Sequence, residues 1–288
     1  MAPGTKGEDH SEHECHLGCP RLHLRRTDST NERARALAIA GAPHGTLVSA
    51  DEQTAGRGRQ GRTWVAPAGS ALLCSLVLRH PPALLSLIAG VAVCDAVQEH
   101  TSTEHTPKAH RPLVKWPNDV VFATAAYPQA NHPPALAAEL RADPPPALAA
   151  ELQADPPPAL AKLAGILVEG RPQESWAVVG IGVNVAVHIE DLPADLRTGA
   201  ASLELFPGSI ESLLAKLLVA FTHRLAQPVD ELLAAWRTRD ALFGREVTWT
   251  GGHGRAQGID GDGRLLVSGE DGATTALSAG EVHFESVG

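Results

Sequence analysis

The stretch Gln53-Thr-Ala-Gly-Arg-Gly-Arg-Gln-Gly-Arg-Thr-Trp64 decides how the rest of this sequence is interpreted. Its closely spaced glycines let the backbone adopt positive φ and close over a ligand. The three arginines Arg57, Arg59 and Arg62 supply planar, permanent charges that suit phosphate or carboxylate. A loop rich in cations and glycine is what an enzyme handling a nucleoside phosphate needs. The alternative is a solvated Arg-Gly loop with affinity for RNA.

The arginines of this loop stand out because the chain as a whole is acidic. Its 288 residues carry a net charge of −9, which argues against general affinity for nucleic acid. The length accommodates one catalytic domain and a small accessory module. We find no apolar run long enough to span a bilayer, and residues 1–20 contain no apolar signal region. A soluble, cytoplasmic protein without membrane association is therefore expected.

The hydrophobic pattern around the loop predicts strands and helices in mixed order. Ser29 and Glu32 fit a capping box that would start a helix ending at Gly41. We predict further helices at 82–99, 209–225 and 229–238, and strands at 46–50, 70–79, 113–116, 162–168 and 176–185. A strand is also expected to continue from the turn at 117–119 through Phe122.

Changes in composition divide the chain into three parts. Residues 1–20 form a polar leader, 21–240 the main domain, and 242–288 a small β-barrel with Gly-Gly and Asp-Gly turns. Within the main domain, about 128–160 repeats the theme Pro-Pro-Ala-Leu. The repeated unit is too short and too proline-rich to stack a core, so it is interpreted as a surface-loop insertion.

Three more segments carry residues suited to a ligand site. Lys115-Trp-Pro-Asn-Asp119 sets opposite charges at a rigid strand end. Lys162-Leu-Ala-Gly-Ile-Leu-Val-Glu169 places a lysine at the mouth of an apolar strand, where Gly165 allows a neighbour to approach. Gly180-Ile-Gly-Val-Asn184 combines small strand residues with a terminal amide. Taken singly, these could be a surface ion pair, a solvated lysine and a β-bulge.

The cysteines fall into two groups. Cys74 and Cys94 lie in apolar segments and are predicted to be buried core thiols. The leader combines Cys15 and Cys19 with nearby histidines (His10, His13 and His16). Their spacing does not match a standard zinc signature, so a His-rich disordered leader is favoured over a zinc or copper site, and no metal-ligating residue is assigned.

In combination, these motifs resemble the biotin protein ligase family, the biotin–[acetyl-CoA-carboxylase] ligases. The similarity runs from about Leu24 to the C-terminus and includes Asp28-Ser-Thr-Asn31. It implies an α+β fold, with a mixed-sheet catalytic domain related to class II aminoacyl-tRNA synthetases and a C-terminal SH3-like β-barrel. It also implies ATP-dependent attachment of biotin to one lysine of a biotin carboxyl carrier domain, through biotinyl-5′-AMP.

The resemblance also implies roles for individual residues. Biotin and the adenylate would be bound by Ser29, Thr30, Asn31, Gln53, Arg57, Gly58, Arg59, Lys162 and Asn184. Lys162 and Arg59 would be catalytic, because positive charge stabilises phosphate oxygens that gain charge. Trp64 would form a wall of the pocket, and Asp119 would orient the acceptor lysine. Mg²⁺ would accompany ATP.

The resemblance also bears on the expected partners and on alternative functions. Some members begin with a DNA-binding domain, but about twenty residues before the catalytic part are too few for one, so no DNA partner is expected. A homodimer is a further expectation inherited from the family. The alternatives are a lipoate or octanoate ligase or transferase of related fold and, from another class, a nucleic-acid-binding module. The Arg-Gly loop and the C-terminal barrel favour biotin.

Overall fold

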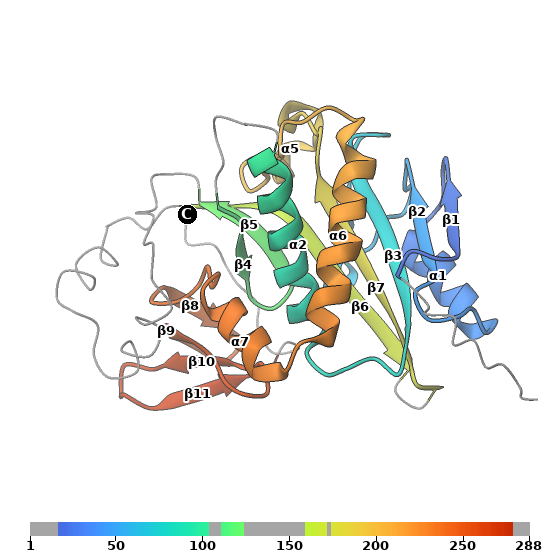
Figure 1. Cartoon of the computed structure of the whole chain (residues 1–288). Helices are drawn as coiled ribbons and strands as arrows, with labels where there is room; N and C mark the ends of the chain where they lie inside the picture. Colours follow the sequence, from blue (N-terminus) through green and yellow to red (C-terminus); the bar gives the residue numbers. More distant parts are fainter. Residues whose placement is uncertain (1–16, 104–110, 124–158, 172–173, 279–288) are drawn as a thin grey trace, which may run out of the picture.

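The computed structural model describes residues 17–103, 111–123, 159–171 and 174–278. Its main element is a seven-stranded sheet in the order β1-β2-β3-β7-β6-β5-β4 (Figure 1). Only the β1–β2 pair is parallel; all the other neighbours in this sheet are antiparallel. The strands are β1 (Arg21–Leu24), β2 (Leu47–Ala50), β3 (Ala71–Arg79), β4 (Leu113–Lys115), β5 (Asp119–Ala123), β6 (Leu160–Arg171) and β7 (Trp176–Asn184). The predicted mixed-sheet α+β architecture is confirmed.

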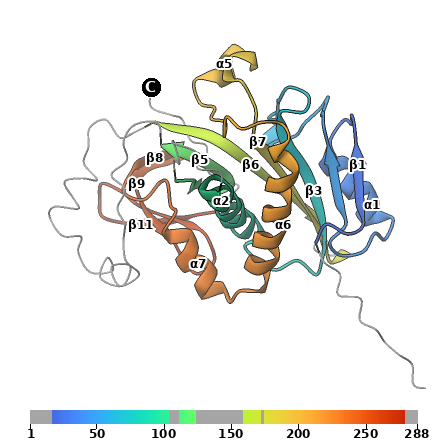
Figure 2. The ribbon, with the colours of Figure 1, turned by 45° about the horizontal axis from the view of Figure 1, so that its top comes forward.

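Helices cover the two faces of this sheet unequally (Figure 2). One face carries α1 (Thr30–Ile39), which packs on β2, β3 and β7. The other face carries α2 (Leu85–Thr103) and α6 (Ser209–Ala226), with α7 (Val229–Arg237) against α2. The short elements are the 3₁₀ turns η1 (Arg59–Gly61) and η3 (Ile189–Asp191) and the helix α5 (Ala194–Arg197). The thinly covered α1 face leaves room for a cavity.

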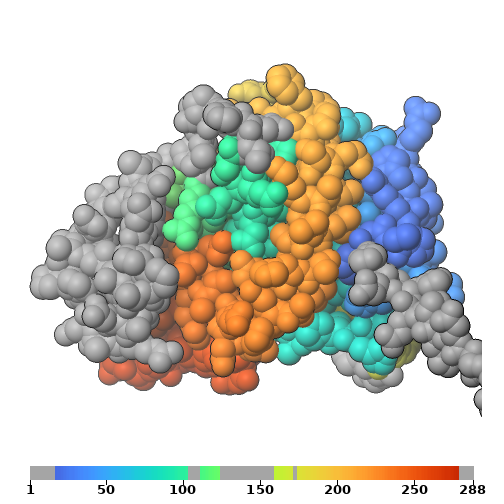
Figure 3. Space-filling model, viewed as in Figure 1, coloured from blue at the N-terminus to red at the C-terminus, as the bar shows by residue number. Residues whose placement is uncertain are grey.

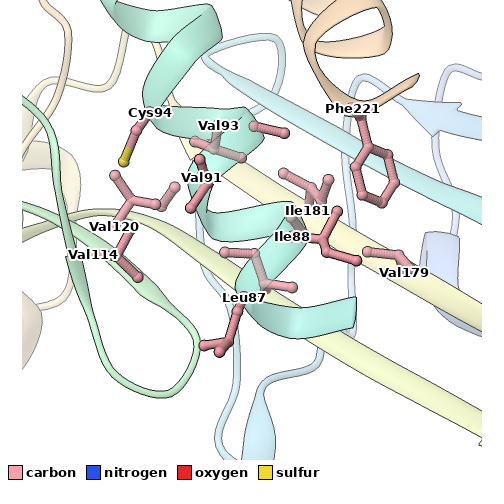
Figure 4. Packing of buried hydrophobic residues seen from close by; sticks show 14 of the residues in the cluster. Leu87, Ile88, Val91, Val93, Cys94, Val114, Val120, Val179, Ile181 and Phe221 are labelled. Atoms are coloured by element: carbon pink, nitrogen blue, oxygen red, sulfur yellow. The ribbon is translucent and has the colours of Figure 1, made fainter. Parts of the chain in front are cut away.

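The main core lies between the sheet and α2. This helix is apolar on nearly all sides because the sheet lies beneath it and α6 and α7 lie outside it. Figure 4 shows Leu87, Ile88 and Val91 of α2 among side chains of the sheet and α6. The sheet side chains in this view are Val114, Val120, Val179 and Ile181, and Phe221 comes from α6. None of the described helices is both long and apolar enough to cross a bilayer.

The C-terminal unit is a four-stranded antiparallel sheet in the order β11-β10-β9-β8. Its strands are β8 (Glu246–Trp249), β9 (Gly252–Ile259), β10 (Leu265–Ser268) and β11 (Thr274–Leu277). They agree with the expected SH3-like barrel. In the space-filling view, these strands (red) lie directly against the orange surface of α7 (Figure 3).

Two features of the N-terminal part differ from the sequence-based expectations. The predicted capping box is wrong: Ser29 is the N-cap residue, but its side chain makes no capping hydrogen bond. Instead, Oε1 of Gln53 accepts the Thr30 amide at 2.7 Å, and Glu32 pairs with arginines. The edge strand β1 was not predicted, because it has only four residues and its alternation of polar and apolar side chains is too short to stand out. Gly41, with φ of 88°, follows the end of α1 as expected.

Some expectations fall outside the described residues. These are the repeat insertion at about 128–160, nearly all of which is undescribed, and the leader residues His10, His13, Cys15 and His16. Of the remaining cysteines, Cys19 is exposed, whereas Cys74 and Cys94 are buried as predicted. Burial raises the pKa of both buried thiols to about 12, so neither is a thiolate near neutral pH.

Candidate functional site

A cavity of about 340 Å³ opens on the α1 face of the sheet. Its size falls within the range of small-molecule sites in proteins. Every residue that the sequence assigned to the site lines it: Ser29, Thr30, Asn31, Gln53, Arg57, Gly58, Arg59, Asp119, Lys162 and Asn184. The motifs are distant in sequence, and the sheet topology brings them together because β3, β7, β6 and β5 are neighbours.

Glycines in β6 and β7 form the floor of this cavity. A Cβ atom at Gly180 would lie 2.0 Å from Oδ1 of Asn31, and one at Gly182 would lie 2.7 Å from the ring of Trp64. Gly165 faces the same ring, at 3.1 Å from a Cβ position. Residues 180, 182 and 184 share one face of β7 because side chains alternate along a strand. The close approach predicted at Gly165 is confirmed, and at Gly180 and Gly182 the neighbours are the side chains of Asn31 and Trp64.

The N-terminus of α1 is fixed by buried polar contacts. Oε1 of Gln53 accepts the Thr30 amide and lies 3.1 Å from the Thr30 hydroxyl. The Ser75 hydroxyl lies 2.8 Å from Thr30 Oγ1 and 2.6 Å from Asn31 Oδ1. Asn31 donates from Nδ2 to the backbone oxygen of Leu167 at 3.3 Å. These contacts hold the cavity wall in one arrangement before any ligand arrives.

The Arg-Gly loop crosses the mouth of the cavity as a tight backbone turn. Gln60 and Gly61 have φ of 55° and 75°, and the Gly58 amide donates to the Arg62 oxygen at 2.7 Å. Gly56 is required by packing, since a Cβ atom there would lie 2.4 Å from the Trp64 oxygen. The glycines therefore allow the backbone of the loop to turn tightly. The arginine side chains of the loop remain available for contacts with a ligand or with other residues.

Arg57 and Arg59 are held by different partners. Arg57 pairs with Glu32 through Nη1, and its Nη2 lies 3.1 Å from Oε1 of Glu169. Arg59 donates from Nη1 to Oδ1 of Asn118 at 3.1 Å. Burial lowers the pKa of Arg59, with the negative charge of Asp119 acting in the opposite direction. An arginine normally titrates so far above neutrality that this group stays charged.

Lys162 lines the same cavity from β6. Its Nζ atom is 2.7 Å from Oδ1 of Asp119 and 5.7 Å from the centre of the Trp64 ring. The Lys162 side chain is 38% exposed, so a ligand can reach it. Asp119 therefore pairs with a lysine of the neighbouring strand, which the motif Lys115–Asp119 did not predict. Burial lowers the pKa of Lys115, which also lines the cavity.

Apart from Asp119 Oδ1, which faces Lys162 Nζ, two buried polar atoms of the cavity lining lack a hydrogen-bond partner within the part of the chain that the structure describes. They are Nε1 of Trp64, a donor, and Oδ1 of Asn184, an acceptor. The Nδ2 atom of Asn184 donates to the Ala201 oxygen at 2.8 Å, which fixes the direction of the amide. Leaving buried polar atoms unpaired costs free energy, so such atoms favour a ligand that supplies the missing partners.

Sequence reasoning missed four residues of the site's supporting structure. Asn118 stood inside a quoted motif but received no role, although it binds Arg59 and donates to the Ile166 oxygen at 2.8 Å. Ser75 and Glu169 were not singled out for the contacts they make. Lys115 was noted only for its charge. No local pattern could have revealed these roles, because each contact joins distant parts of the chain.

The described residues offer a site for an anionic ligand with polar and apolar parts. Cations of the Arg-Gly loop, β4 and β6 line it, together with aromatic and glycine surfaces. No group of three or more His, Cys, Asp or Glu side chains that could bind a metal ion occurs among these residues. The arrangement can stabilise negative charge on a carboxylate or phosphate by fixed electrostatics.

Comparison with known families gives two matches along the chain. Residues 23–185 match the model described as the biotin/lipoate A/B protein ligase family. Residues 242–284 match the biotin protein ligase C terminal domain. The first match contains all the residues that line the loop side and the floor of the cavity, and the second covers the C-terminal strands.

Individual relatives match over nearly their full length. The biotin–[acetyl-CoA-carboxylase] ligase of Paracoccus denitrificans is 31% identical, over 91% of this chain and 99% of the relative. The enzyme of the same name from Mycobacterium tuberculosis is also 31% identical, over 89% and 85%. Among solved structures, the biotin protein ligase from Aquifex aeolicus in complex with biotin and ATP is 25% identical. It covers 92% of this chain and 99% of its own, with a TM-score of 0.66.

Proposed function

The chain belongs to the biotin/lipoate A/B protein ligase family, and from this membership we propose that it is a biotin protein ligase. It attaches biotin to a lysine of a biotin carboxyl carrier domain and converts ATP to AMP and pyrophosphate. The observation that carries this proposal is the convergence of Arg57, Arg59 and Lys162 on one cavity with a glycine floor. Several cations around one cavity suit an intermediate that is both an acyl group and a phosphate ester.

Biotin would occupy the part of the cavity next to α1. The polar side chains of Ser29, Thr30 and Asn31 lie there, beside Gln53. Such groups complement a cyclic urea, which offers both donors and an acceptor. Gly180 leaves space for Asn31 that a larger residue would remove. The biotin carboxylate would then extend toward Lys162 and the arginine loop.

In the first step, an oxygen of the biotin carboxylate attacks the α-phosphorus of ATP. A new acyl–oxygen–phosphorus linkage forms, the bond to the pyrophosphate oxygen breaks, and pyrophosphate leaves. Arg59 and Lys162 supply positive charge where the phosphate oxygens gain negative charge. Asn118 keeps Arg59 in place through its 3.1 Å contact, and Asp119 does so for Lys162. Trp64 Nε1 and Asn184 Oδ1 are available to the adenylate.

In the second step, the amine of the acceptor lysine attacks the acyl carbon. The carbon–oxygen bond breaks, AMP leaves, and the amine loses a proton as the amide forms. The enzyme needs no nucleophile of its own, because biotin supplies the carboxylate of the first step and the acceptor lysine supplies the amine of the second. Asp119 lies beside Lys162 and is placed to orient the incoming amine once the ligand has engaged Lys162. The enclosed site protects the mixed anhydride from water.

Mg²⁺, the acceptor protein and the cellular setting complete the proposal. Glu32 and Glu169 are engaged by Arg57 and Asp119 by Lys162, and no group of three or more His, Cys, Asp or Glu side chains that could bind a metal ion occurs among the described residues. Mg²⁺ would accompany ATP and would be held mainly by phosphate oxygens and water. The partner is a carrier domain of acetyl-CoA carboxylase or a related carboxylase, in the cytoplasm, and the enzyme acts as a homodimer.

The test is acyl transfer to a purified carboxyl carrier fragment. The protein is incubated with ATP, Mg²⁺ and either biotin or lipoate, and the fragment is analysed by mass spectrometry. We expect a biotinyl adduct on one lysine that depends on ATP, with no lipoyl adduct. A lipoyl adduct without a biotinyl one would replace this proposal with lipoate ligation. Omitting ATP and substituting the acceptor lysine by arginine are the controls.

A further inference from the structure

Glu169 sits at the junction of the arginine loop and the cavity wall. Its Oε1 atom is 3.1 Å from Nη2 of Arg57, and its Oε2 atom accepts a hydrogen bond from Nδ2 of Asn31 at 2.9 Å. One carboxylate thus contacts two residues that reach the ligand site from different elements. The Glu169 side chain is only 24% exposed, so its contacts are less screened by water than those of a surface carboxylate.

A second carboxylate contacts the same arginine from the opposite side. Glu32, in the first turn of α1, pairs with Nη1 of Arg57. It also pairs with Arg35 of its own helix at 3.1 Å. Unlike Glu169, Glu32 makes no contact with Asn31 or any other wall residue among the hydrogen bonds of the described chain. The two carboxylates therefore share one arginine but have different surroundings.

We propose that Glu169 is a positioning residue for Arg57 and Asn31, and that Glu32 competes with the anionic ligand for Arg57. This inference rests on the proposed function, because it assigns the ligand as biotin and its adenylate. Neither carboxylate touches the reacting atoms. Both act through Arg57, and Glu169 acts through Asn31 as well.

The positioning role follows from what would happen without the carboxylate. Asn31 lies against Gly180 and beside Ser75, so its amide is oriented correctly only if Nδ2 meets an acceptor and Oδ1 a donor. Beside the Leu167 oxygen, Glu169 supplies the closer acceptor for Nδ2, and its full negative charge also draws in Arg57. The ligand-binding amide and the ligand-binding guanidinium are in this way set by the same group.

The competing role follows from the count of charges. Arg57 carries one positive charge and faces two carboxylates before any anion binds. A carboxylate or phosphate ligand that reaches the guanidinium shares its single positive charge with these carboxylates and can take over one of their contacts. Glu32 is the one that can be released without disturbing the cavity wall, since Arg35 remains to neutralise it. Its negative charge also repels an anionic ligand.

The first experiment measures biotin affinity by calorimetry for wild type and Glu169→Gln. The glutamine keeps an oxygen for Asn31 but presents an uncharged amide to Arg57. We expect the Kd for biotin to rise about tenfold, the size of one charge-assisted hydrogen bond. The matched control is Glu246→Gln, which breaks a surface pair with Arg255 at 3.1 Å in the C-terminal unit. A Glu169→Gln Kd equal to that of the control would overturn the positioning role.

The second experiment has two parts. Glu32→Gln is measured by itself, and Glu169→Gln is measured in protein that also carries Arg57→Ala. We expect Glu32→Gln to lower the Kd for biotin or the KM for ATP. A rise in both constants, as large as the rise for Glu169→Gln, would overturn the proposal that Glu32 competes with the ligand. In the Arg57→Ala background, Glu169→Gln should cost clearly less than in wild type, because coupled residues are non-additive. Full additivity would contradict action through Arg57. Wild type that failed to bind or transfer biotin would instead refute the proposed function.

Discussion

Lys162 and Asp119 face each other across neighbouring strands, with Nζ and Oδ1 2.7 Å apart at the open side of the cavity. Strand β6 brings the lysine and β5 brings the carboxylate. The register shift between Val120 and Val121 lies one residue beyond the pairing of Asp119 with Gly165. Asp119 therefore holds the ammonium group of Lys162 until a ligand binds and takes over that contact.

Asp119→Asn should lower the rate of biotinyl-adenylate formation about tenfold. The asparagine keeps the shape of the side chain but removes the charge that holds Lys162. Because both side chains are partly exposed, the effect should stay near one power of ten. ATP–pyrophosphate exchange in the presence of biotin measures this step. A variant as fast as wild type in that exchange but slow in transfer would show that Asp119 acts only in the second step, on the acceptor lysine.

Lys162→Ala and Arg59→Ala should each lower pyrophosphate release by about 10²–10³-fold, the effect of removing one donor to a developing charge. Thermal unfolding should change by only a few degrees, because neither residue belongs to the apolar core. Arg255→Ala in the C-terminal unit is a control for the loss of a cation. Normal pyrophosphate release by both site variants would show that neither side chain takes part in this reaction.

The local signals in the sequence predicted most of the fold. Apolar periodicity located α2, α6 and α7, and the strand patterns located β2, β3, β6 and β7 to within a few residues. The Arg-Gly loop and the paired strand glycines were recognisable because glycine marks places where another group comes close. Both signals are carried by residues adjacent in sequence, and that is why they could be read without a structure.

The remaining features depend on partners that are distant along the chain. Ser29 and Glu32 have the spacing of a capping box, but Gln53 binds the Thr30 amide and Arg57 binds Glu32. Tertiary contacts outweighed a local preference worth about 1 kcal/mol. Asn118 acquires its role in the same way, from an arginine that lies in another loop.

Gly180→Ala should weaken biotin binding about tenfold or more. The new Cβ atom would lie 2.0 Å from Oδ1 of Asn31, so that side chain must leave its position beside Ser75. Gly208→Ala is the matched control, because no atom lies within 4 Å of a Cβ there and its φ is −61°. Calorimetric titration with biotin compares the two. Equal affinities would mean that Asn31 does not contact biotin.

Asp240→Asn should flatten the pH dependence of stability between about pH 4 and pH 7. Asp240 lies between α7 and the C-terminal strands, where it accepts the Leu242 amide at 2.8 Å and its Oδ2 atom has no hydrogen-bond partner among the described residues. Burial raises the pKa of this carboxyl to about 7, while backbone hydrogen bonds from Leu242 and Phe243 act in the opposite direction.

The sign of the effect follows from proton binding. Between the unfolded pKa of about 3.9 and the folded pKa, the folded chain retains a proton that the unfolded chain has lost. The free energy of unfolding therefore falls as pH rises through this window, by about 1.4 kcal/mol per pH unit from this group, and is flat above it. The substituted asparagine cannot lose a proton, so urea unfolding at several pH values should show wild type losing stability relative to Asp240→Asn as pH rises from about 4 to about 7. Parallel curves for the two proteins would show that the carboxyl is already ionised in the folded state at the acidic end of this window.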